Sequence, residues 1–587
     1  MRCSVPAAAF STRDALRVSV RTAGDSLVDS ARSAPGWLAV SALLLLLQAV
    51  LPAGQVVFLE RLVDGLAAGR SSWGPLLGLT VVVGAMYPLG QVGLAATQRL
   101  ALRLRLRYRT ELAQAAARLT PSRLAQPDVT TDLEASQTAT AVMDAVAGKA
   151  LQVLGAGVTS VVLCAVVWQL NPVSGLLVLA ALVPTVLAFT GISRMEARGW
   201  PLVAASDRRA AYATEQLVQQ RPGTELAVLG SGRKVADLVA VRRTEATQVL
   251  DRMIGKAMLW ELAAALATAV LFGGALVALV RGGASGAGTA AAVAGTISGL
   301  NAIRLCGYAF GMIVTAAPQA RIYRHFVNSV PPAEPQVVVR DVACIELDGV
   351  GYTYPGTDRP ALRDVSIRAE RGEMIALVGV NGAGKTTAVN TLVGMLSPSS
   401  GRVLLDGRDA AELTEAERLG HFGLLVQEFG KFEFSLRDVV ALGAPDDVTD
   451  DAVRRALVCA EAEAFTRRMS GLDAQLGQQW GGTGVSGGQW QRLALARIYL
   501  RDAGVWILDE PTSAIDAEAE REIFSELCRT RHERITVVVS HRAWTLREMD
   551  RIYVLDDGVV VQQGRYDELL AATPGRFAEI FAGQAKS

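Results

Sequence analysis

Six long apolar runs with few charged residues constrain this chain more than any other feature of its sequence. They span residues 37–59, 75–97, 150–170, 173–192, 258–280 and 289–316. A helix needs roughly 20 mostly apolar residues to cross a bilayer, and each run reaches or approaches that length. The sequence therefore predicts an all-α membrane domain of six spanning helices. Asn171 and Pro172 form the tight turn between the third and fourth of them.

The rest of the sequence is of a different kind, as expected for a chain of 587 residues. Hydrophobic residues make up 51% of the chain and charged residues 20%, but the apolar excess stops before residue 336. Beyond that point the sequence is typical of a soluble α/β enzyme. We expect an N-terminal cytoplasmic segment at 1–35, a transmembrane domain at 36–330, a Pro-rich linker at 331–340 and a second domain at 341–587.

Basic residues in the loops predict the orientation in the membrane. Arginine and lysine gather in the long loops 98–149 and 193–257, whereas the opposite side carries only Arg61, Arg70 and Arg281. Positive loops stay in the cytoplasm, so both termini are expected there, in a multi-pass protein of the plasma membrane. Both long loops have helical character with a break, at 121–127 and 221–223. They predict helices that extend into the cytosol and turn back through a short transverse helix; plain loops are the alternative.

The net charge and the N-terminal residues further limit the class of protein and the kind of N-terminal segment. The net charge of +1 argues against a nucleic-acid-binding protein. Residues 11–33 fit an amphipathic helix on the cytoplasmic membrane surface and fit a disordered tail equally well. The first apolar run is too long for the core of a cleaved signal peptide, so it is expected to be a retained anchor.

A phosphate-binding motif opens the second half. Residues 375–378 predict a strand, and the pattern G-x-x-x-x-G-K-T follows at once as Gly379, Val380, Asn381, Gly382, Ala383, Gly384, Lys385 and Thr386. In such a loop the backbone N–H groups wrap the phosphates and the next helix presents its positive N-terminus. Lys385 would reach the β- and γ-phosphates and Thr386 would hold Mg²⁺. The motif predicts ATP and Mg²⁺ as ligands, in an α/β P-loop NTPase domain.

An acidic pair supports this interpretation. The apolar strand predicted at 504–508 ends in Asp509 and Glu510. Asp509 suits Mg²⁺ coordination, and Glu510 is placed to polarise an attacking water, as phosphoryl transfer to water requires. The alternative, two carboxylates that only cap the next element, fits poorly with a phosphate loop upstream.

A further motif resembles a known family. Val485 is followed by Ser486, Gly487, Gly488 and Gln489, a run that resembles the signature motif of ATP-binding-cassette (ABC) proteins, with Val in place of the usual Leu. Ser486 can cap a helix whose N-terminus faces an anion. Ser486 and Gln489 also form a capping-box pattern, and the two interpretations are compatible.

The resemblance implies roles for further residues, which occur in the expected order. Tyr354 resembles the aromatic that stacks on adenine, and Thr387 completes the nucleotide-binding loop. Gln427 resembles the glutamine that senses Mg²⁺ and the membrane domain, and His541 resembles the switch histidine at the γ-phosphate. Asp516, in the segment 513–516, resembles the element that joins the two ATP sites. The implied catalytic residues are Glu510, His541 and Gln427, and the implied metal ligands are Thr386, Gln427 and Asp509.

The whole chain is similar to an exporter-type half-transporter, with the membrane domain first and the cassette second. In that family two halves combine, and each ATP lies between the phosphate loop of one cassette and the signature of the other. The resemblance implies ATP-driven export by a homodimer or by a heterodimer with a second half-transporter. Residues 426–437 resemble a bacterial subgroup linked to modified peptides, and a lipid or a drug-like metabolite is the alternative substrate. An importer with the exporter fold and a non-transporting membrane sensor are rival functions.

Two charged residues fall within or beside the predicted spans. Glu261 and Arg304 lie about one helical turn apart in depth on consecutive helices. Intramembrane charges usually face the interior of the helix bundle. We expect them to pair or to line the translocation path together; otherwise Arg304 faces an aqueous gap alone.

Overall fold

The computed structural model describes residues 12–281, 286–332, 334, 337–444, 448–512, 515–572 and 574–581. The chain forms two compact units. The first comprises Met1–Leu119 and Pro127–Pro331, and the second comprises Thr120–Gln126 and Pro332–Ser587.

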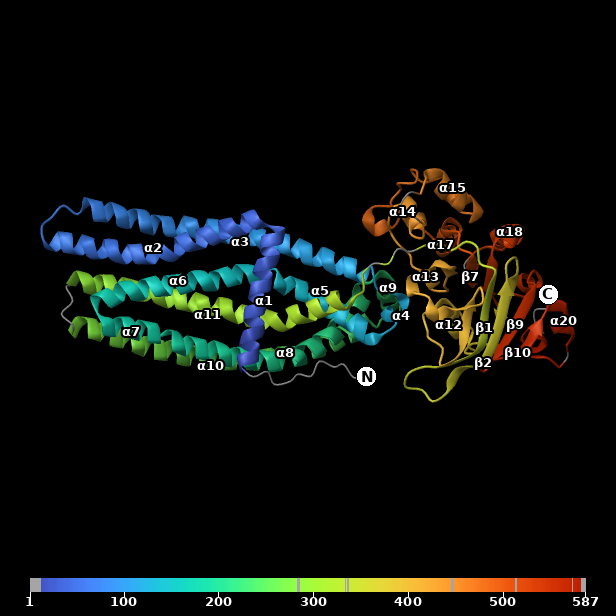
Figure 1. The fold of residues 1–587 in the computed structure, drawn as a ribbon, viewed down its shortest axis with the longest axis horizontal. Coiled ribbons are helices and arrows are strands. Elements are labelled where there is room, and N and C mark those ends of the chain that lie inside the picture. The colour runs from blue at the N-terminus through green and yellow to red at the C-terminus, as the bar shows by residue number, and fades with distance from the viewer. Residues whose placement is uncertain are drawn as a thin grey trace. The chain divides into compact units, whose positions relative to one another are not determined.

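The first unit is entirely helical in its described residues (Figure 1). Its helices are α1 (Thr12–Ser33), α2 (Pro35–Ala67), α3 (Trp73–Ala116), α5 (Pro127–Met143), α6 (Val146–Leu170), α7 (Pro172–Ala180), α8 (Leu182–Val218), α9 (Gln220–Val228), α10 (Gly232–Arg281) and α11 (Gly286–Ser329). With 50 residues, α10 is about 75 Å long. A bilayer core is only about 30 Å thick, so this helix extends well beyond any membrane it crosses, as the sequence predicts.

Five of the six predicted spans lie within single helices long and apolar enough to cross a membrane, namely α2, α3, α6, α10 and α11. The fourth run, 173–192, does not. It is divided between α7 and the start of α8, with a turn at Ala181. Pro184 accounts for the break, because it has no N–H to bond the carbonyl of Ala180 one turn earlier. The turn at Asn171 is confirmed, and its side chain accepts from the N–H of Val173 at 2.9 Å.

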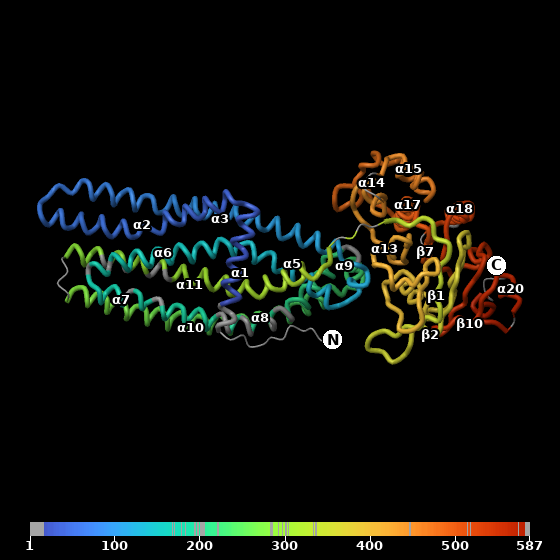
Figure 2. The backbone as a smooth tube through the Cα atoms, viewed as in Figure 1, coloured from blue at the N-terminus to red at the C-terminus, as the bar shows by residue number. Residues whose placement is uncertain are grey.

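Several pairs of helices in this unit pack side by side, as α2 and α3 do in Figure 2. A polar contact fixes this pair: Gln48 Nε2 donates to the carbonyl of Leu89 at 2.6 Å. A Cβ at Gly93 would come within 2.4 Å of that Nε2 atom. The glycine therefore makes room for the glutamine, whose amide would be costly if left unpaired in hydrocarbon.

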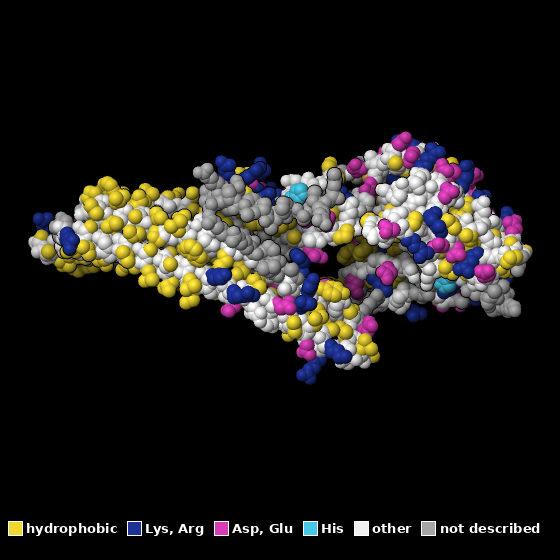
Figure 3. Space-filling model, turned by 90° about the horizontal axis from the view of Figure 1, so that it is seen from below, with side chains coloured by type: hydrophobic (Ala, Val, Ile, Leu, Met, Phe, Trp, Pro, Cys, Tyr) yellow, Lys and Arg dark blue, Asp and Glu magenta, His cyan; other side chains and the backbone are white. Residues whose placement is uncertain are grey.

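The outward surface of these helices is apolar. Leu43, Val81 and Leu266 are each about 60% exposed, and Figure 3 shows hydrophobic side chains covering a large part of this unit's surface. An apolar surface of this extent is unfavourable in water and favourable in lipid. The first unit is thus built to face a bilayer.

The N-terminal helix α1 is tied to the bundle by a carboxylate. Asp29 lies 3.3 Å from Arg107 Nη2 and 3.6 Å from Arg324 Nη2, and it accepts a hydrogen bond from the Tyr108 hydroxyl at 3.2 Å. Ser19, Thr22, Ser26 and Ser30 form one buried stripe on the same helix. The sequence left a helix and a disordered tail open for this segment, and the structure contains a helix.

Both long loops contain the short helices that their breaks predict, α4 (Pro121–Leu124) and α9. The segment around α4 groups with the second unit, although its neighbours in sequence belong to the first. Within the second unit, the Ser122 hydroxyl donates to Glu415 at 2.9 Å. Glu415 is the first residue of α13 (Glu415–Gly420), so the contact is made at a helix N-terminus.

The second unit contains two sheets. The strands are β1 (Cys344–Thr353), β2 (Pro360–Glu370), β3 (Met374–Val378), β4 (Ser400–Leu405), β5 (Arg408–Asp409), β6 (Phe422–Leu425), β7 (Val505–Asp509), β8 (Ile535–Val539), β9 (Arg551–Asp556) and β10 (Val559–Gly564). The first sheet has the order β2-β1-β4-β5 and is antiparallel. The second has the order β10-β9-β3-β8-β7-β6 and is parallel except for β10.

Both faces of the six-stranded sheet are buried. Successive residues alternate between two apolar clusters: Ile507 and Val537 face the antiparallel sheet, and Trp506 and Val538 face the helices. The helices of this unit, besides α4 and α13, are α12 (Lys385–Val393), α14 (Leu436–Ala441), α15 (Asp450–Cys459), α16 (Glu463–Thr466), α17 (Gly487–Arg501), α18 (Ala517–Arg529), α19 (Ala543–Arg547), α20 (Tyr566–Ala571) and α21 (Arg576–Phe581). Burial on both faces explains why these strands are continuous apolar runs.

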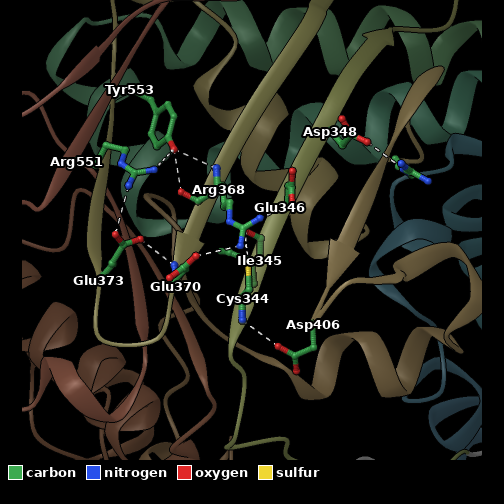
Figure 4. Close-up of polar contacts among 11 residues, drawn as sticks. Cys344, Ile345, Glu346, Asp348, Arg368, Glu370, Glu373, Asp406, Arg551 and Tyr553 are labelled. Carbon is green, nitrogen blue, oxygen red and sulfur yellow. Dashed lines mark hydrogen bonds and ion pairs between the residues drawn. The ribbon is translucent and has the colours of Figure 1, made fainter.

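A polar network joins the two sheets (Figure 4). The Tyr553 hydroxyl on β9 donates to the carbonyl of Arg368 on β2 at 2.8 Å and accepts from the N–H of the same residue at 3.1 Å. Arg551 donates to that hydroxyl and to Glu373. These contacts fix the sheets to each other, and the predicted α/β cassette is confirmed.

Candidate active site

Three neighbouring strands bring the predicted site residues to one edge of the parallel sheet. The phosphate loop follows β3, the acidic pair ends β7, and His541 comes two residues after β8. In the sheet β8 lies between β3 and β7, and all three run parallel. Their carboxyl ends therefore meet, which is where open α/β sheets bind their ligands.

The phosphate loop has a backbone that requires glycine. Gly382 and Gly384 have φ values of 84° and 101°. A Cβ at Gly384 would lie 2.9 Å from the carbonyl oxygen of Ala361. Gly384 also caps α12, so the loop passes directly into the N-terminus of a helix. This is a strand–loop–helix arrangement suited to anions.

Lys385 folds back over this loop. Its ammonium donates to the carbonyls of Gly379 at 2.7 Å and Val380 at 3.1 Å. Burial lowers the pKa of Lys385 from its usual value, while the nearby charges of Asp509 and Glu510 act in the opposite direction. Lys385 is thus a partly desolvated cation beside two carboxylates.

The two carboxylates at the end of β7 differ in their surroundings. Burial raises the pKa of Asp509 above its usual range, the charge of Glu510 adds to the rise, and Lys385 opposes it. Glu510 leaves the strand with a φ of 48°, and its N–H donates to the carbonyl of Val539 at 2.9 Å. This last bond connects the ends of β7 and β8.

Glu510 contacts the switch histidine predicted from the sequence. Its Oε1 lies 3.0 Å from His541 Nδ1. The His541 side chain is 65% exposed, so it is accessible to a ligand. Gln491, which is buried on α17, donates to the backbone carbonyl of Glu510 at 2.9 Å.

Tyr354 lies just after β1 and adjoins the helix of the phosphate loop. Its hydroxyl is 3.1 Å from the Thr387 hydroxyl, and its ring packs edge-on against Tyr352 with 4.9 Å between centroids. The side chain of Thr386 is exposed whereas that of Thr387 is buried. The two threonines therefore have different surroundings, and Thr386 is the one free to hold a metal.

The signature run begins a helix, as its capping pattern predicts. The Ser486 hydroxyl accepts from the N–H of Gln489 at 3.3 Å, and Gln489 Oε1 accepts from the N–H of Ser486 at 2.9 Å. Ser486 and Gly487 are exposed. The N-terminus of α17 thus faces outward, where it can meet another molecule.

Asp516 caps α18 and is linked to α17. It accepts from the N–H of Ala519 at 3.0 Å and pairs with Arg492 Nη2 at 2.8 Å. The hydrogen bond from Ala519, followed by other backbone N–H groups and Arg492, holds the pKa of Asp516 below its usual range. Ser513 and Ala514 of the same segment lie outside the described residues. Gln427 is exposed, two residues after β6.

The donor set fits ATP with Mg²⁺. The described residues include no cluster of three His, Cys, Asp or Glu that could hold a metal alone. Mg²⁺ in nucleotide sites takes one or two protein oxygens and completes its shell with phosphates and water. The Thr386 hydroxyl and the Asp509 carboxylate are oxygen donors of that kind, and the cradle at Gly384 fits phosphate.

A cavity of about 580 Å³ lies elsewhere, lined by Arg371, Glu373, Arg531, Asp550, Arg551 and Glu568 among others. It adjoins the start of β3, whereas the phosphate loop follows its end. This cavity and the phosphate loop therefore lie at opposite edges of the sheet.

The sequence analysis missed four polar residues that support the site: Gln491, Thr512, Glu520 and Arg542. Gln491 is in the signature helix, and Thr512 and Arg542 each adjoin a motif residue, so position alone could have pointed to them. Nothing in the sequence around Glu520 pointed to it, because it contacts residues beside the motifs only in the folded chain.

Comparison with known proteins agrees with this geometry. The family model described as ABC transporter matches residues 362–513. An ATP-dependent lipid A-core flippase of Thiobacillus denitrificans is 40% identical over 236 residues, which are 40% of this chain and 40% of that protein. A Beta-(1-->2)glucan export ATP-binding/permease protein of Agrobacterium vitis is 36% identical over 236 residues, again 40% of each chain.

The match to these curated relatives thus covers less than half of their length. A solved structure extends it at the level of the fold. A bacterial Atm1-family ABC exporter with ATP bound superimposes with a TM-score of 0.79 at 21% identity, over 94% of this chain and 98% of that one. Residues 362–513 of this chain therefore match the ABC transporter family, and the chain has the fold of an ABC exporter.

Proposed function

We propose that this chain hydrolyses ATP and uses the free energy to export a solute across the plasma membrane, as one half of a dimeric transporter. The observation that carries the proposal is the contact between Glu510 and His541, 3.0 Å apart where β7 and β8 end beside the phosphate loop. A carboxylate and an imidazole at that position suit the activation of water beside a γ-phosphate.

The phosphate loop binds the nucleotide in this proposal. Phosphate oxygens replace the loop carbonyls as acceptors for Lys385, and the N–H groups from Gly382 to Thr386 surround the phosphates. Tyr354 stacks on the base. Thr386, Asp509 and Gln427 would hold Mg²⁺, which would neutralise phosphate charge.

Glu510 is the general base, and His541 orients it and contacts the γ-phosphate. The carboxylate of Glu510 accepts a proton from the attacking water, and the imidazole fixes that carboxylate through Nδ1. Proton transfer by a positioned side chain contributes roughly 10²–10⁴ in rate.

A second subunit completes each site. Ser486 and the two glycines after it are exposed at the start of α17 and bind the ATP held by a partner's phosphate loop. The fold match is to an ABC exporter, and the proposed partner is a second copy or a related half-transporter. Asp516 lies at the joint between the two sites.

Export is favoured over import by the names of the relatives, a flippase and a glucan export protein. The proposed substrate is a modified peptide, a lipid or a drug-like metabolite. Import and sensing without transport remain the rival functions. The basic loops support an orientation with both termini in the cytoplasm.

The test is ATP hydrolysis by the purified chain in lipid nanodiscs, compared with Glu510→Gln. The variant should bind a fluorescent ATP analogue normally and hydrolyse ATP on the order of 10² times more slowly. Glu548→Gln, an exposed glutamate on the same cassette, is the control. Near-normal turnover by Glu510→Gln would refute the assigned base.

Direction and substrate need a second measurement. Peptides, lipids and drugs are screened for stimulation of turnover, and a stimulating compound is then followed in inside-out vesicles. ATP-dependent accumulation inside those vesicles supports export. Depletion would indicate import, and turnover without movement of any compound would indicate a sensor.

A further inference from the structure

A buried glutamate outside every sequence motif contacts two loops of the catalytic site. Glu520 lies in the first turns of α18, and its side chain is 3% exposed. A carboxylate this far from water is costly to the fold unless its oxygens are paired. The groups that pair with the Glu520 carboxylate therefore indicate its role.

Both oxygens of Glu520 have a partner. The Thr512 hydroxyl donates to Oε1, and Arg542 Nη1 forms an ion pair with Oε2. Thr512 is itself buried. Thr512 follows Glu510 by two residues, and Arg542 follows His541 directly. One carboxylate thus holds the two chain segments that carry the catalytic pair.

These two segments need such an anchor. Ladder hydrogen bonds position β7 and β8 relative to each other as far as Asp509 and Val539. Glu510 then departs from strand geometry with a positive φ, and His541 projects with most of its side chain in solvent. The N–H of Glu510 makes the last bond between these strands, to the carbonyl of Val539, so the 3.0 Å approach of Glu510 to His541 lies at the end of the ladder.

We propose that Glu520 is a positioning residue for ATP hydrolysis, which holds the Glu510 and His541 loops at their working separation through Thr512 and Arg542. The inference rests on the proposed function. Glu520 does not touch the nucleotide site directly; it acts through its two partners. Misplacing a catalytic group by about 1 Å can cost roughly 10² in rate, so loss of this anchor should appear in turnover.

The first experiment compares Glu520→Gln with the wild-type chain in nanodiscs. The amide has the same shape and can still accept from Thr512, but it gives up the charge that pairs with Arg542. We expect kcat for ATP to fall by roughly tenfold or more while KM for ATP changes by less than about twofold. Glu518→Gln, exposed on the same helix two residues earlier, should leave both constants unchanged.

A double-mutant cycle with Arg542→Gln tests the pathway. If the ion pair is the anchor, Glu520→Gln with Arg542→Gln should be about as slow as the slower single variant, not slower by the product of both effects. Glu520→Asp keeps the charge on a shorter arm and should recover part of the lost kcat. Thermal unfolding of each variant, with and without ATP, separates a positioning effect from a folding defect.

The outcomes are distinct. A fall in kcat at constant KM and an unchanged melting temperature supports the inference, and unaltered turnover of Glu520→Gln overturns it. A rise in KM equal to the fall in kcat also overturns it, because the residue would then support binding. If the variant does not fold, Arg542→Lys takes its place, since it keeps the charge and moves the anchor. If wild type itself does not hydrolyse ATP, the proposed function fails and the inference fails with it.

Discussion

At the scale of single residues, two adjacent carboxylates at the end of β7 lie in unlike environments. Asp509 is desolvated, and burial raises its pKa, whereas Glu510 turns out of the strand toward His541. Asp509 belongs to the strand, whereas Glu510 leaves strand geometry with a positive φ, so the two carboxylates have different surroundings. The separation matches a metal ligand beside a general base.

The pKa of Asp509 leads to a prediction about stability. A carboxyl whose pKa is raised in the folded state stabilises the fold when protonated and loses that contribution as pH rises through its folded pKa. Asp509→Asn removes the charge, so it should raise the melting temperature of the nucleotide-free chain at pH 8. The gain should be smaller at pH 5 than at pH 8, because a carboxyl with a raised pKa takes up its proton at a higher pH than an ordinary one.

The measurement is thermal unfolding in detergent at both pH values, followed by tryptophan fluorescence. Asp567→Asn, which changes an exposed carboxylate on α20, is the matched control. A gain that is the same at pH 5 and pH 8 would contradict the assigned cause.

The sequence was sufficient to predict those site residues that stand in a recognisable motif. Lys385, Glu510 and Ser486 stand in motifs whose spacing encodes a loop, a strand end and a helix cap, and all three elements are present. Glu520 could not be predicted in the same way. Its importance arises from Thr512 and Arg542, which meet it only after β7, β8 and α18 have packed.

At the scale of elements, α1 joins two long helices of the first unit. Asp29 contacts Arg107 on α3 and Arg324 on α11, and Tyr108 adds a hydrogen bond. α3 leads toward the segment around α4, and α11 leads into the linker of the cassette. α1 thus braces the two helices that continue toward the second unit.

Removing this carboxylate should loosen α1. Hydrogen bonds to charged groups contribute about 1.5–3 kcal/mol, so Asp29→Ala should raise the opening equilibrium of α1 by about tenfold or more. Hydrogen exchange of the amides in 12–33 measures this directly. Arg32→Ala, exposed on the same helix, should have no effect. Unchanged exchange in Asp29→Ala would mean that the Ser and Thr stripe alone holds the helix.

Hydropathy predicted the helices of the membrane unit, except where a proline interrupts an apolar run. Length and apolar content located α2, α3, α6, α10 and α11, but composition does not register that Pro184 interrupts the fourth run at Ala181. The partner of Ser122 was likewise beyond the sequence, because Glu415 is almost 300 residues away. Pairing of Glu261 with Arg304 stays a prediction.

At the scale of the whole molecule, the exposed N-terminus of α17 implies a partner. Ser486 can serve a nucleotide site only if a phosphate loop approaches it, and in the proposed dimer that loop belongs to the other subunit. Two variants distributed between the subunits test this arrangement.

Differently tagged chains allow defined pairs to be purified. With composite sites, one chain carrying Lys385→Ala and its partner carrying Ser486→Arg leave one complete site per dimer. Both changes in one chain, paired with wild type, leave none. We expect trapped nucleotide in the first pair and little in the second. The opposite pattern would show that each chain forms its own site, and purification only as single chains would contradict the dimer.

The grouping of Thr120–Gln126 with the cassette has a consequence for the gene. No single cut in the coding sequence separates the two units, because a piece of the second is encoded inside the first. A fragment that starts at Pro332 would lack Ser122, and Glu415 would lose its hydrogen-bond donor. A cassette moved alone into a related transporter would likewise lack its own Ser122 to bond Glu415. Recombination can therefore replace this cassette faithfully only if a few codons more than 200 positions upstream change with it.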